Sequence, residues 1–405
     1  MLNPTEHLFS LALGLRIPWE CTDATFSEAD SHLDLIIDFA AGSRFPCPEC
    51  EAVDNPVHDT VSKQWRHLDF FQHTCTIHAR VPRIRCQRCG VRQVPVPWAR
   101  SGSGFTLLFE ALVLSMAPHM PVRAIARHMH TDDKRLWTIL RHYVTSARDR
   151  EEFHEVTAIA VDETSSRRGH NYVTVVADID AKRVIFATPG KGKETIGRFT
   201  TDFHAHNGDS DAVRNICMDM SPAYIAAATE CLPNAIQTYD RFHLMKLANE
   251  AMDEVRRADV KEHAYLKGTR YLWLSHPDRL TKAERERIEG LQQINRNTAR
   301  AYHLVLTLRG FWDVPLAQAE EYLYSFCSWA MRSRLEPFKK LALTIRRHWN
   351  GIVNYHYSRM TTGFMEGINS LIQAAKRKAR GYATYENLIT MIYLIAGKLK
   401  LPLPI

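Results

Sequence analysis

The feature that most constrains the fold is a series of short apolar runs between residues 155 and 258. Three of them, VTAIAVD, AVRNICMD and AIQTYD, end in an aspartate and read as buried strands. NYVTVVADID and KRVIFATPG predict a hairpin around residues 179–182, and KETIGRFTTDFHAH predicts a helix. Helices are also predicted for PAYIAAATECL and FHLMKLANEAMDEVRR. The predicted order is strand, strand, strand, helix, strand, helix, strand, helix.

This is the order of the ribonuclease-H-like fold, and it would bring two acids together. Asp162 ends the first strand and Asp219 the fourth, and these strands are neighbours in that topology. Two-metal phosphodiester chemistry needs hard oxygen ligands that hold two Mg²⁺ ions about 4 Å apart. Taken alone, each aspartate is more commonly a cap or turn residue. Asp178 and Asp180 are predicted to have turn roles, and Glu163 is predicted to point away from Asp162.

A third acid, Glu366, lies in the late segment GFMEGIN, where flanking glycines allow close backbone approach. Residues 346–380 contain seven Lys or Arg residues and one acid, which is Glu366 itself. A single acid in a basic stretch is unusual for a solvated helix. It is the arrangement expected if DNA phosphates lie across a metal held by that carboxylate.

The strongest local signal is the pair of CxxC motifs formed by Cys47, Cys50, Cys86 and Cys89. Four thiolates at about 2.3 Å suit tetrahedral Zn²⁺ in a closed structural site, so a zinc ribbon is predicted. Free buried thiols or a redox pair are the alternatives. Cys75, His73 and His78 could substitute as ligands, but their alternation is better explained by a strand. The remaining cysteines, Cys21, Cys217, Cys231 and Cys327, are predicted to be core residues. This pattern indicates a reducing compartment.

Residues 105–150 predict three helices: FTLLFEALVLSMA, PVRAIARHM beginning at Pro121, and KRLWTILRHYV capped by Thr131. The last two, with a tight turn between them, resemble a helix-turn-helix. A small helical bundle without a DNA role is the alternative.

Several basic residues are candidate DNA contacts, with a solvated basic face as the alternative. The arginines at 83, 85, 88, 92 and 100 surround the second CxxC motif, with no acid between residues 83 and 100. The other candidates lie on the helix-turn-helix, in the loop beyond Asp162, and at the end of the Glu366 helix. They are Arg123, Lys134, Arg135, Arg141, Arg167, Arg168, Lys376, Arg377, Lys378 and Arg380.

The chain resembles the DDE transposases of bacterial insertion sequences, specifically the ISL-three family. The resemblance is carried by AVDETSSRRGHNYVTVVADID, ICMDMSPAYIAAA, YDRFHLMKL and RMTTGFMEGINSLIQAAKRKARGY. It covers nearly the whole chain, because the CxxC ribbon and the helix-turn-helix are also that family's N-terminal pattern.

The resemblance implies that Asp162, Asp219 and Glu366 bind two Mg²⁺ or Mn²⁺ ions for DNA cleavage and strand transfer. Asp240 and His243 match a D-x-x-H pattern found in several transposase groups, and either active-site support or a structural hydrogen bond fits them. Asn369 is a further candidate for active-site support. The implied partners are the element's terminal inverted repeats, target DNA and a second copy of the chain, in a dimer or larger oligomer.

We therefore expect a multidomain α/β protein with a ribonuclease-H-like catalytic core and a helical insertion, preceded by a zinc ribbon and a helix-turn-helix. The expected ranges are 1–100 for the β-rich zinc-ribbon domain, 101–150 for the helix-turn-helix, and 155–258 with 346–399 for the catalytic domain. The helical insertion would occupy residues 259–345. WARSGSG at residues 98–104 reads as a linker.

Composition excludes some other classes. Apolar residues make up 45% and charged residues 24%, which is typical of a globular protein. No run approaches the roughly 20 apolar residues of a membrane span, and the N-terminus lacks the features of a signal peptide. We expect a bacterial cytoplasmic, nucleoid-associated protein. A metal-dependent nuclease or resolvase of the same fold, a DNA-binding regulator without catalysis, and a domesticated copy kept for binding are the alternatives.

Overall fold

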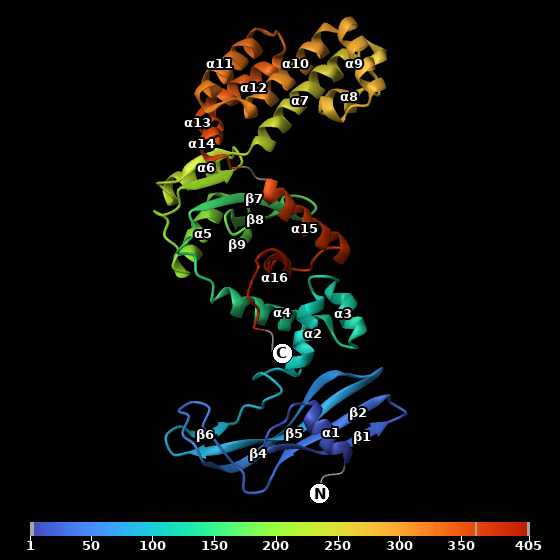
Figure 1. Cartoon of the computed structure of the whole chain (residues 1–405), viewed down its shortest axis with the longest axis vertical. Helices are drawn as coiled ribbons and strands as arrows, with labels where there is room; N and C mark the ends of the chain where they lie inside the picture. The colour runs from blue at the N-terminus through green and yellow to red at the C-terminus, as the bar shows by residue number, and fades with distance from the viewer. Residues whose placement is uncertain (1–3, 361–362, 403–405) are drawn as a thin grey trace. The chain divides into compact units, whose positions relative to one another are not determined.

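The computed structural model describes residues 4–360 and 363–402, and the chain divides into two compact units (Figure 1). The first extends to Arg148 and takes in Arg377–Arg380 and the chain from Leu399 onward. The second spans Asp149–Lys376 and Gly381–Lys398.

The first unit begins with helix α1 (Pro4–Ala12) and a mixed sheet ordered β1-β2-β5-β4-β3, with β6 paired to β5. Its strands are β1 (Trp19–Ser27), β2 (His32–Phe39), β3 (Arg44–Phe45), β4 (Asn55–Phe70), β5 (His73–Cys86) and β6 (Gly90–Gln93). The long β4–β5 hairpin is its centre. Cys75, Ile77, Ala79 and Val81 are buried at alternate positions of β5, so one face of this strand forms the core.

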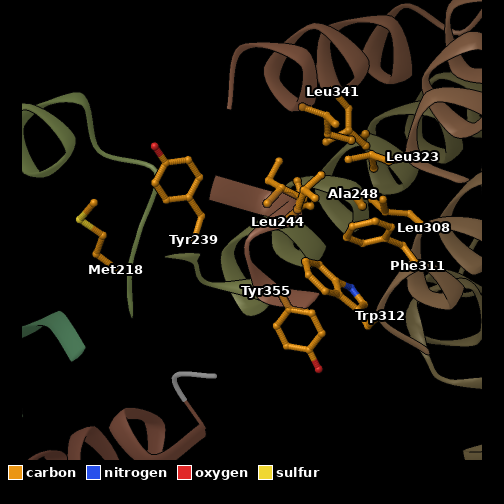
Figure 2. Packing of buried hydrophobic residues seen from close by; sticks show 14 of the residues in the cluster. Met218, Tyr239, Leu244, Ala248, Leu308, Phe311, Trp312, Leu323, Leu341 and Tyr355 are labelled. Carbon is orange, nitrogen blue, oxygen red and sulfur yellow. The ribbon is translucent and has the colours of Figure 1, made fainter. Parts of the chain in front are cut away.

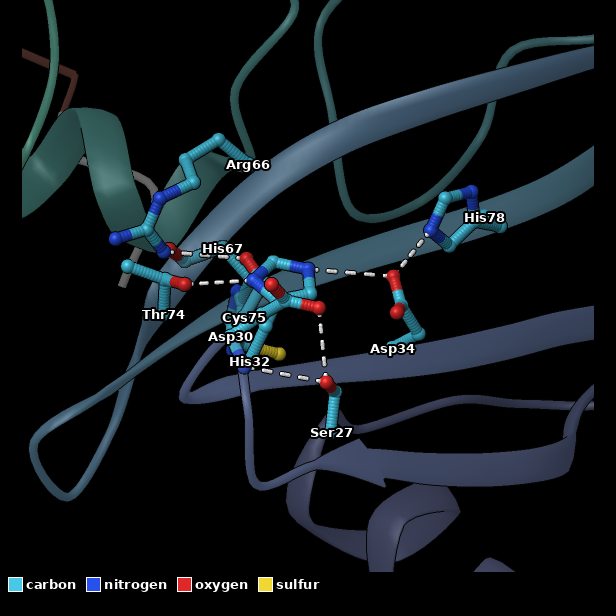
Figure 3. Close-up of polar contacts among 9 residues, drawn as sticks. All are labelled: Ser27, Asp30, His32, Asp34, Arg66, His67, Thr74, Cys75 and His78. Atoms are coloured by element: carbon cyan, nitrogen blue, oxygen red, sulfur yellow. Dashed lines mark hydrogen bonds and ion pairs between the residues drawn. The ribbon is translucent and has the colours of Figure 1, made fainter.

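Polar side chains link β2 to its parallel neighbour β5 (Figure 3). His78 Nε2 lies 2.6 Å from Asp34 Oδ1, and His32 Nδ1 lies 2.6 Å from Thr74 Oγ1. These side chains alternate in sequence with the buried ones. The contacts therefore fix the register of the pair from the side opposite the core.

Three helices follow: α2 (Leu107–Met116), α3 (Val122–His128) and α4 (Asp133–Arg148). Leu136, Ile139 and Leu140 form the buried side of α4. The predicted cap of α4 is wrong by one residue, because the carboxylate of Asp132, rather than Thr131, accepts from the Lys134 amide at 2.6 Å. Asp is as good a cap as Thr, and the sequence HTDD offers both.

The segment 98–104 connects the sheet to α2 and is held by specific contacts. Trp98 is buried, and the backbone of Gly104 accepts from the Arg66 amide at 3.0 Å. Arg100 Nε and Ser103 Oγ both donate to the fully buried carboxylate of Glu110, at 3.0 Å and 2.6 Å. Tyr143 Oη of α4 donates to the same carboxylate at 2.8 Å. Glu110 thus joins this segment, α2 and α4.

The second unit contains a five-stranded sheet ordered β11-β10-β7-β8-β9. Its strands are β7 (Ala158–Arg167), β8 (Asn171–Asp178), β9 (Arg183–Pro189), β10 (Asn215–Met218) and β11 (Ile236–Tyr239). β7, β8 and β9 are antiparallel, whereas β10 and β11 run parallel to β7. With α5 (Lys193–Ala205) and α6 (Pro222–Cys231) between strands, this is the predicted ribonuclease-H-like order.

Asp162 does not end its strand, contrary to the sequence prediction. β7 continues to Arg167 because residues 163–167 pair with β8. What stops near Asp162 is the neighbouring strand β10, whose last residue is Met218. The partly buried carboxylate of Asp162 therefore lies at a step in the sheet.

A helical region follows the last strand (Figure 1). Its α-helices are α7 (Arg241–Val260), α8 (Arg270–Leu274), α9 (Lys282–Ile294), α10 (Arg296–Gly310), α11 (Leu316–Arg332), α12 (Glu336–Arg347), α13 (Trp349–Val353) and α14 (Tyr355–Ser358). α7 packs on α10 and α12 around Leu244, Ala248, Leu308 and Leu341 (Figure 2). The helical region thus begins physically with α7.

The tryptophans of this region are core residues. Trp273 is fully buried and its indole N–H donates to Thr269 Oγ1 at 3.1 Å. Trp312 is buried against Tyr355, and Trp329 packs partly buried against the same core.

The last two helices are α15 (Gly363–Ala379) and α16 (Tyr385–Ala396). The hydroxyl of Tyr393 in α16 accepts from the Ala187 amide of β9 at 3.1 Å. Within residues 4–360 and 363–402, no helix is long and apolar enough to span a bilayer.

Candidate active site and metal centre

Three aspartates lie at the level where β10 and β11 of the second unit end, with Asp162 inside the neighbouring strand β7. In the β7–β10 pairing Ala160 is opposite Cys217, so Asp162 and Asp219, each two residues further on, fall at the same level. Met218 is opposite Tyr239 in the β10–β11 pairing, which places Asp240 beside Asp219. The sheet thus gathers three carboxylates from three adjacent strands.

The surroundings of Asp162 disfavour the ionised form of its carboxyl group. Burial raises the pKa of Asp162, and the nearby carboxylates of Asp240 and Asp219 raise it further. The Glu163 amide, which donates to Asp162 Oδ1 at 2.7 Å, and His243 act in the opposite direction. Divalent cations are the partners that such a set of oxygen ligands favours.

Asp240 and His243 form a pair beside these carboxylates. Asp240 Oδ1 caps α7 by accepting from the Phe242 amide at 3.1 Å, and Oδ2 lies 3.0 Å from His243 Nδ1. The bond to Asp240 raises the pKa of His243, and Asp162 and Asp219 act in the same direction. The structural hydrogen bond considered for these residues is therefore present, and the pair also belongs electrostatically to the aspartate site.

Helix α15 lies along β7 through a row of polar contacts. Asn369 Nδ2 donates to Asp162 Oδ2 at 2.7 Å, Gln373 Nε2 donates to Thr164 Oγ1 at 2.8 Å, and Lys376 Nζ donates to the Ser165 carbonyl at 2.6 Å. The spacing 369, 373, 376 is that of one helix face. Gln373 was missed from the sequence, although this spacing behind Glu366 could have revealed it.

Glu366 lies one turn before Asn369 on α15, so it continues this polar row. It is exposed. Among residues 4–360 and 363–402, Asp162, Asp219 and Glu366 are not a group whose ligand oxygens lie within 4.8 Å of one another. Thr361 and Thr362 of the late motif lie outside the described residues.

The competing acids have other partners. Tyr224 Oη donates to Glu163 Oε1 at 2.8 Å and lies 3.0 Å from Thr174 Oγ1, so Glu163 faces α6 and away from the Asp162 carboxylate. Burial raises the pKa of Glu163. Asp178 Oδ1 accepts from the amides of Asp180 and Ala181 at 3.0 Å and 3.1 Å, which is the turn role predicted from the sequence.

The four predicted zinc ligands come together in the first unit. The Sγ atoms of Cys47, Cys50, Cys86 and Cys89 all lie within 4.8 Å of one another. The backbone amides of Cys89 and Arg88 lower the pKa of the Cys86 thiol to about 7. The neighbouring thiols of Cys50 and Cys47, together with burial, raise the pKa of Cys89 to about 12. The cluster suits a structural zinc ion.

The loops that carry the ligands are fixed by other contacts. The Cys47 amide donates to the Ala52 carbonyl at 2.9 Å, and Gly90 adopts φ +76°, a conformation that favours glycine. Arg92 Nε donates to Glu49 Oε1 at 2.5 Å and so joins the two CxxC loops. Cys21 and Cys75, by contrast, are buried in the sheet core.

The basic residues around the second CxxC motif are largely engaged within the unit. Arg83 pairs with Asp59, Arg92 with Glu49 and Arg100 with Glu110. The acids come from distant positions in the chain, which is why the local sequence seemed free of negative charge. This favours a structural role for these arginines over a DNA surface.

The helix-turn-helix candidates lie on and beside α3 and α4. Arg123 and Lys134 are exposed, and Arg123 Nε lies 3.5 Å from Asp133 Oδ2. Arg135 is exposed and its guanidinium lies 4.2 Å from the centre of the Phe105 ring. Arg141 is partly buried.

The remaining candidates lie in two places. Arg167 and Arg168 are exposed at the end of β7, where the Arg167 guanidinium bonds the Ala383 carbonyl. Arg377, Lys378 and Arg380 are exposed at the end of α15, whereas Lys376 is half-buried against β7 and burial lowers its pKa.

A sheet of this order, with carboxylates gathered from three adjacent parallel strands, is that of a ribonuclease-H-like enzyme. Three family models match the chain. A model described as transposase, of the ISL3 type, matches residues 159–392. The helix-turn-helix domain of transposase family ISL3 matches residues 94–144. The zinc finger of the transposases of IS204, IS1001, IS1096 and IS1165 matches residues 43–89. The chain belongs to the ISL3 family of insertion-sequence transposases.

Two relatives match most of the chain. The transposase for insertion sequence element IS1557 of Mycobacterium tuberculosis is 30% identical over 366 residues, which cover 83% of this chain and 82% of the relative. The transposase for insertion sequence element IS1001 of Bordetella parapertussis is 25% identical over 350 residues, covering 84% and 86%. The family predicted from the sequence motifs is confirmed.

Proposed function

We propose that this transposase binds the terminal repeats of its element and catalyses metal-dependent cleavage and strand transfer, with Asp162, Asp219 and Glu366 as the metal ligands. The alignment of Asp162 with Asp219 on adjacent parallel strands carries the proposal. Two divalent cations bound there would stabilise charge on the attacking and departing oxygens of the phosphodiester.

The chain's own residues have distinct tasks in this proposal. Asp162 and Asp219 are fixed by the sheet and supply oxygen ligands, whereas Glu366 supplies a third ligand from α15. Asn369 holds the Asp162 carboxylate in one orientation through its 2.7 Å bond. The Oδ1 atom of Asn369 is buried and has no hydrogen-bond partner, so it is a further hard oxygen available at the site.

Asp240 and His243 act in support. Because His243 bonds Asp240 and interacts with both Asp162 and Asp219, its positive form balances part of the carboxylate charge. We assign it the role of orienting the site and placing a cation beside the scissile strand. A covalent protein–DNA intermediate is not required.

DNA contacts are proposed for two groups of residues. On the helix-turn-helix, Arg123, Lys134, Arg135 and Arg141 would contact the terminal repeat. In the loop beyond Asp162 and at the end of α15, Arg167, Arg168, Lys376, Arg377, Lys378 and Arg380 would neutralise the phosphates of the reacting strands. A dimer or larger oligomer would hold two ends together.

For this function we propose the same domain boundaries that were expected from the sequence. Residues 1–100 would form the zinc-ribbon domain, 101–150 the helix-turn-helix, and 155–258 with 346–399 the catalytic core interrupted by the insertion at 259–345. Zn²⁺ would be structural. The protein would act at the bacterial nucleoid.

An in vitro strand-transfer assay with the element's own ends tests the proposal. Asp162→Asn, Asp219→Asn and Glu366→Gln keep the side-chain shape and remove the charge. We expect each to reduce joining by at least about a thousandfold, about 4 kcal/mol in activation free energy, while binding of the ends is retained. Asp180→Asn, at the exposed hairpin tip, is the matched control and keeps full activity.

The outcomes separate the alternatives. Cleavage without joining would point to a nuclease or resolvase. End binding by the wild type with neither reaction would point to a regulator. Full activity of all three variants would remove the triad from the mechanism.

A further inference from the structure

The helical region carries a groove that the metal-site residues do not explain. It has a volume of about 670 Å³ and follows one face of α7, with α8 as its other wall. The face runs from Phe242, two residues after Asp240, to Arg257. At 1.5 Å per helical residue this is about 22 Å. The groove therefore begins beside the proposed catalytic end and leads away from it.

The far end of the groove holds three arginines around one acid. Asp253 Oδ1 accepts from Arg256 at 3.0 Å and 2.7 Å, and Asp253 Oδ2 lies 3.3 Å from Arg257 Nε and 3.5 Å from Arg270 Nε. A single carboxylate cannot neutralise three guanidinium groups. The Asp253 and Arg256 side chains are only 12% and 11% exposed, so they form a fixed base.

The outward part of this cluster is accessible. The Arg257 and Arg270 side chains are 66% and 54% exposed. Over the whole groove, four cations, Arg256, Arg257, Arg270 and Lys246, face two acids, Asp253 and Glu250, which leaves a surplus of two positive charges. Fixed, exposed guanidinium groups with surplus charge match the phosphates of a nucleic-acid backbone.

The near end of the groove carries an aromatic side chain instead of an arginine cluster. Phe242 is 53% exposed although it adjoins the capping aspartate of α7. An exposed aromatic ring at one end and guanidinium groups at the other form a surface for a DNA backbone, because the ring can contact a sugar while the cations contact phosphates. An acidic protein segment could also pair with the arginines, but its binding would not explain why the groove begins next to the active site.

We propose that the α7–α8 groove binds the phosphate backbone of duplex DNA that continues from the phosphodiester cleaved at the active site. This rests on the proposed function. The groove length corresponds to about six base pairs at 3.4 Å each. Arg257 and Arg270 are the phosphate-contacting residues, and Asp253 is a positioning residue that acts through them.

The test is fluorescence anisotropy with the full chain and labelled duplexes of the element's end. The duplexes extend by about 3 or about 12 base pairs beyond the cleaved bond, on either side in turn. The variant is Arg257→Gln with Arg270→Gln. The matched control is Arg279→Gln with Arg287→Gln, which removes the same charge from exposed positions of the same helical region outside the groove.

On the long extension of one side, we expect the groove variant to bind about tenfold more weakly. Its slope of log affinity against log salt should be smaller by about 1.8, the equivalent of two phosphate contacts. On the duplexes with short extensions, the groove variant should bind with the affinity of the wild type. The control variant should bind with the affinity of the wild type on all duplexes.

Three outcomes would overturn the proposal: an unchanged salt slope on both long extensions, an equal loss in the control, or a changed sedimentation coefficient with unchanged DNA binding. The last would assign the groove to contact with a second copy. If the wild type fails to cleave or join DNA, the proposed function fails, but the length-dependent binding still decides whether the groove contacts DNA.

Discussion

Asn369 Nδ2 donates a hydrogen bond to Asp162 Oδ2 at 2.7 Å across 207 positions of the chain. This contact joins the helix that carries Glu366 to the strand that carries Asp162. The helical region lies between these residues in sequence, so two distant segments must pack correctly before the proposed triad can form. The contact thus links folding of the unit to assembly of its site.

Replacing Asn369 with alanine should lower the rate of DNA cleavage by about tenfold or more near pH 7. A hydrogen bond to a charged group contributes about 1.5–3 kcal/mol, and here it favours the ionised Asp162, whose pKa burial already raises. The pKa of Asp162 should rise further, so the defect should shrink as the pH increases and the carboxylate ionises. Single-turnover cleavage at several pH values measures this.

Gln373→Ala is the matched control, because Gln373 anchors α15 to Thr164 without touching Asp162. It should have a smaller effect that does not change with pH. Equal, pH-independent losses in both variants would show that Asn369 only anchors the helix.

Loss of one zinc ligand should unfold the ribbon. Cys50→Ser removes one of four thiolates that lie within 4.8 Å of one another, and structural zinc sites contribute folding free energy directly. We expect the zinc content, measured by mass spectrometry of the purified protein, to fall from about one ion per chain to near zero. Cys231→Ser, a half-buried cysteine of the second unit, should keep the zinc. Full zinc retention in Cys50→Ser would disprove the site.

The buried carboxylate of Glu110 should be essential for the first unit. Glu110→Ala leaves Arg100, Ser103 and Tyr143 without their shared acceptor. Breaking a buried ion pair in this way costs about 3–5 kcal/mol. Glu110→Gln keeps an acceptor and should cost less.

Urea unfolding measures the difference in the free energy of unfolding between Glu110→Ala and Glu110→Gln. Glu155→Ala, at a side chain 90% exposed, is the control and should change stability by no more than about 0.5 kcal/mol. If Glu110→Ala behaved like this control, the polar network would have no role in stability.

Acid should destabilise the first unit through His67. Burial, with a smaller effect of Arg66, lowers the pKa of His67 to about 4, against about 6.5 in the unfolded chain. Between these values the unfolded chain binds a proton and the folded one does not. His67 therefore leaves the free energy of unfolding unchanged above about pH 6.5 and lowers it as the pH drops toward 4.

His67→Gln should flatten this part of the pH dependence. Thermal unfolding followed by zinc release between pH 7 and pH 4.5 measures it, with the exposed His154→Gln as control. An unchanged pH dependence in His67→Gln would assign the acid sensitivity to other groups.

The strand order, the four cysteines and the family followed from the sequence because each depends on local pattern or on motif. Apolar runs of strand length fix β7, β10 and β11, and CxxC spacing brings two thiols together without knowledge of the fold. Long-range partners could not be predicted in the same way. The pairing of Arg92 with Glu49 joins positions 43 apart, and neither residue carries a signal for the other.

The extent of β7 shows a second limit. VTAIAVD is the apolar part of the strand, but ETSSR continues it because β8 supplies hydrogen bonds to those residues. Strand length there depends on the partner and not on apolar pattern. The row formed by Asn369, Gln373 and Lys376 is an intermediate case, since its helical spacing is visible in the sequence but its target strand is not.

Gly351 couples the helical region to the aspartate site. A Cβ atom at this position of α13 would lie 2.3 Å from Cε2 of Tyr239, the residue directly before Asp240. Gly351→Ala should push the ring and the end of β11 aside. We expect a loss of about 1–3 kcal/mol in stability, as for other overpacked sites, and slower cleavage with unchanged end binding.

Gly290→Ala is the matched control, because nothing lies within 4 Å of its added Cβ and the residue is exposed on α9. Alanine there should stabilise the helix by up to about 1 kcal/mol. The measurements are thermal unfolding and single-turnover cleavage for both variants. Normal cleavage by Gly351→Ala despite lower stability would show that β11 tolerates displacement of Tyr239, and that Asp240 is positioned by its cap on α7 alone.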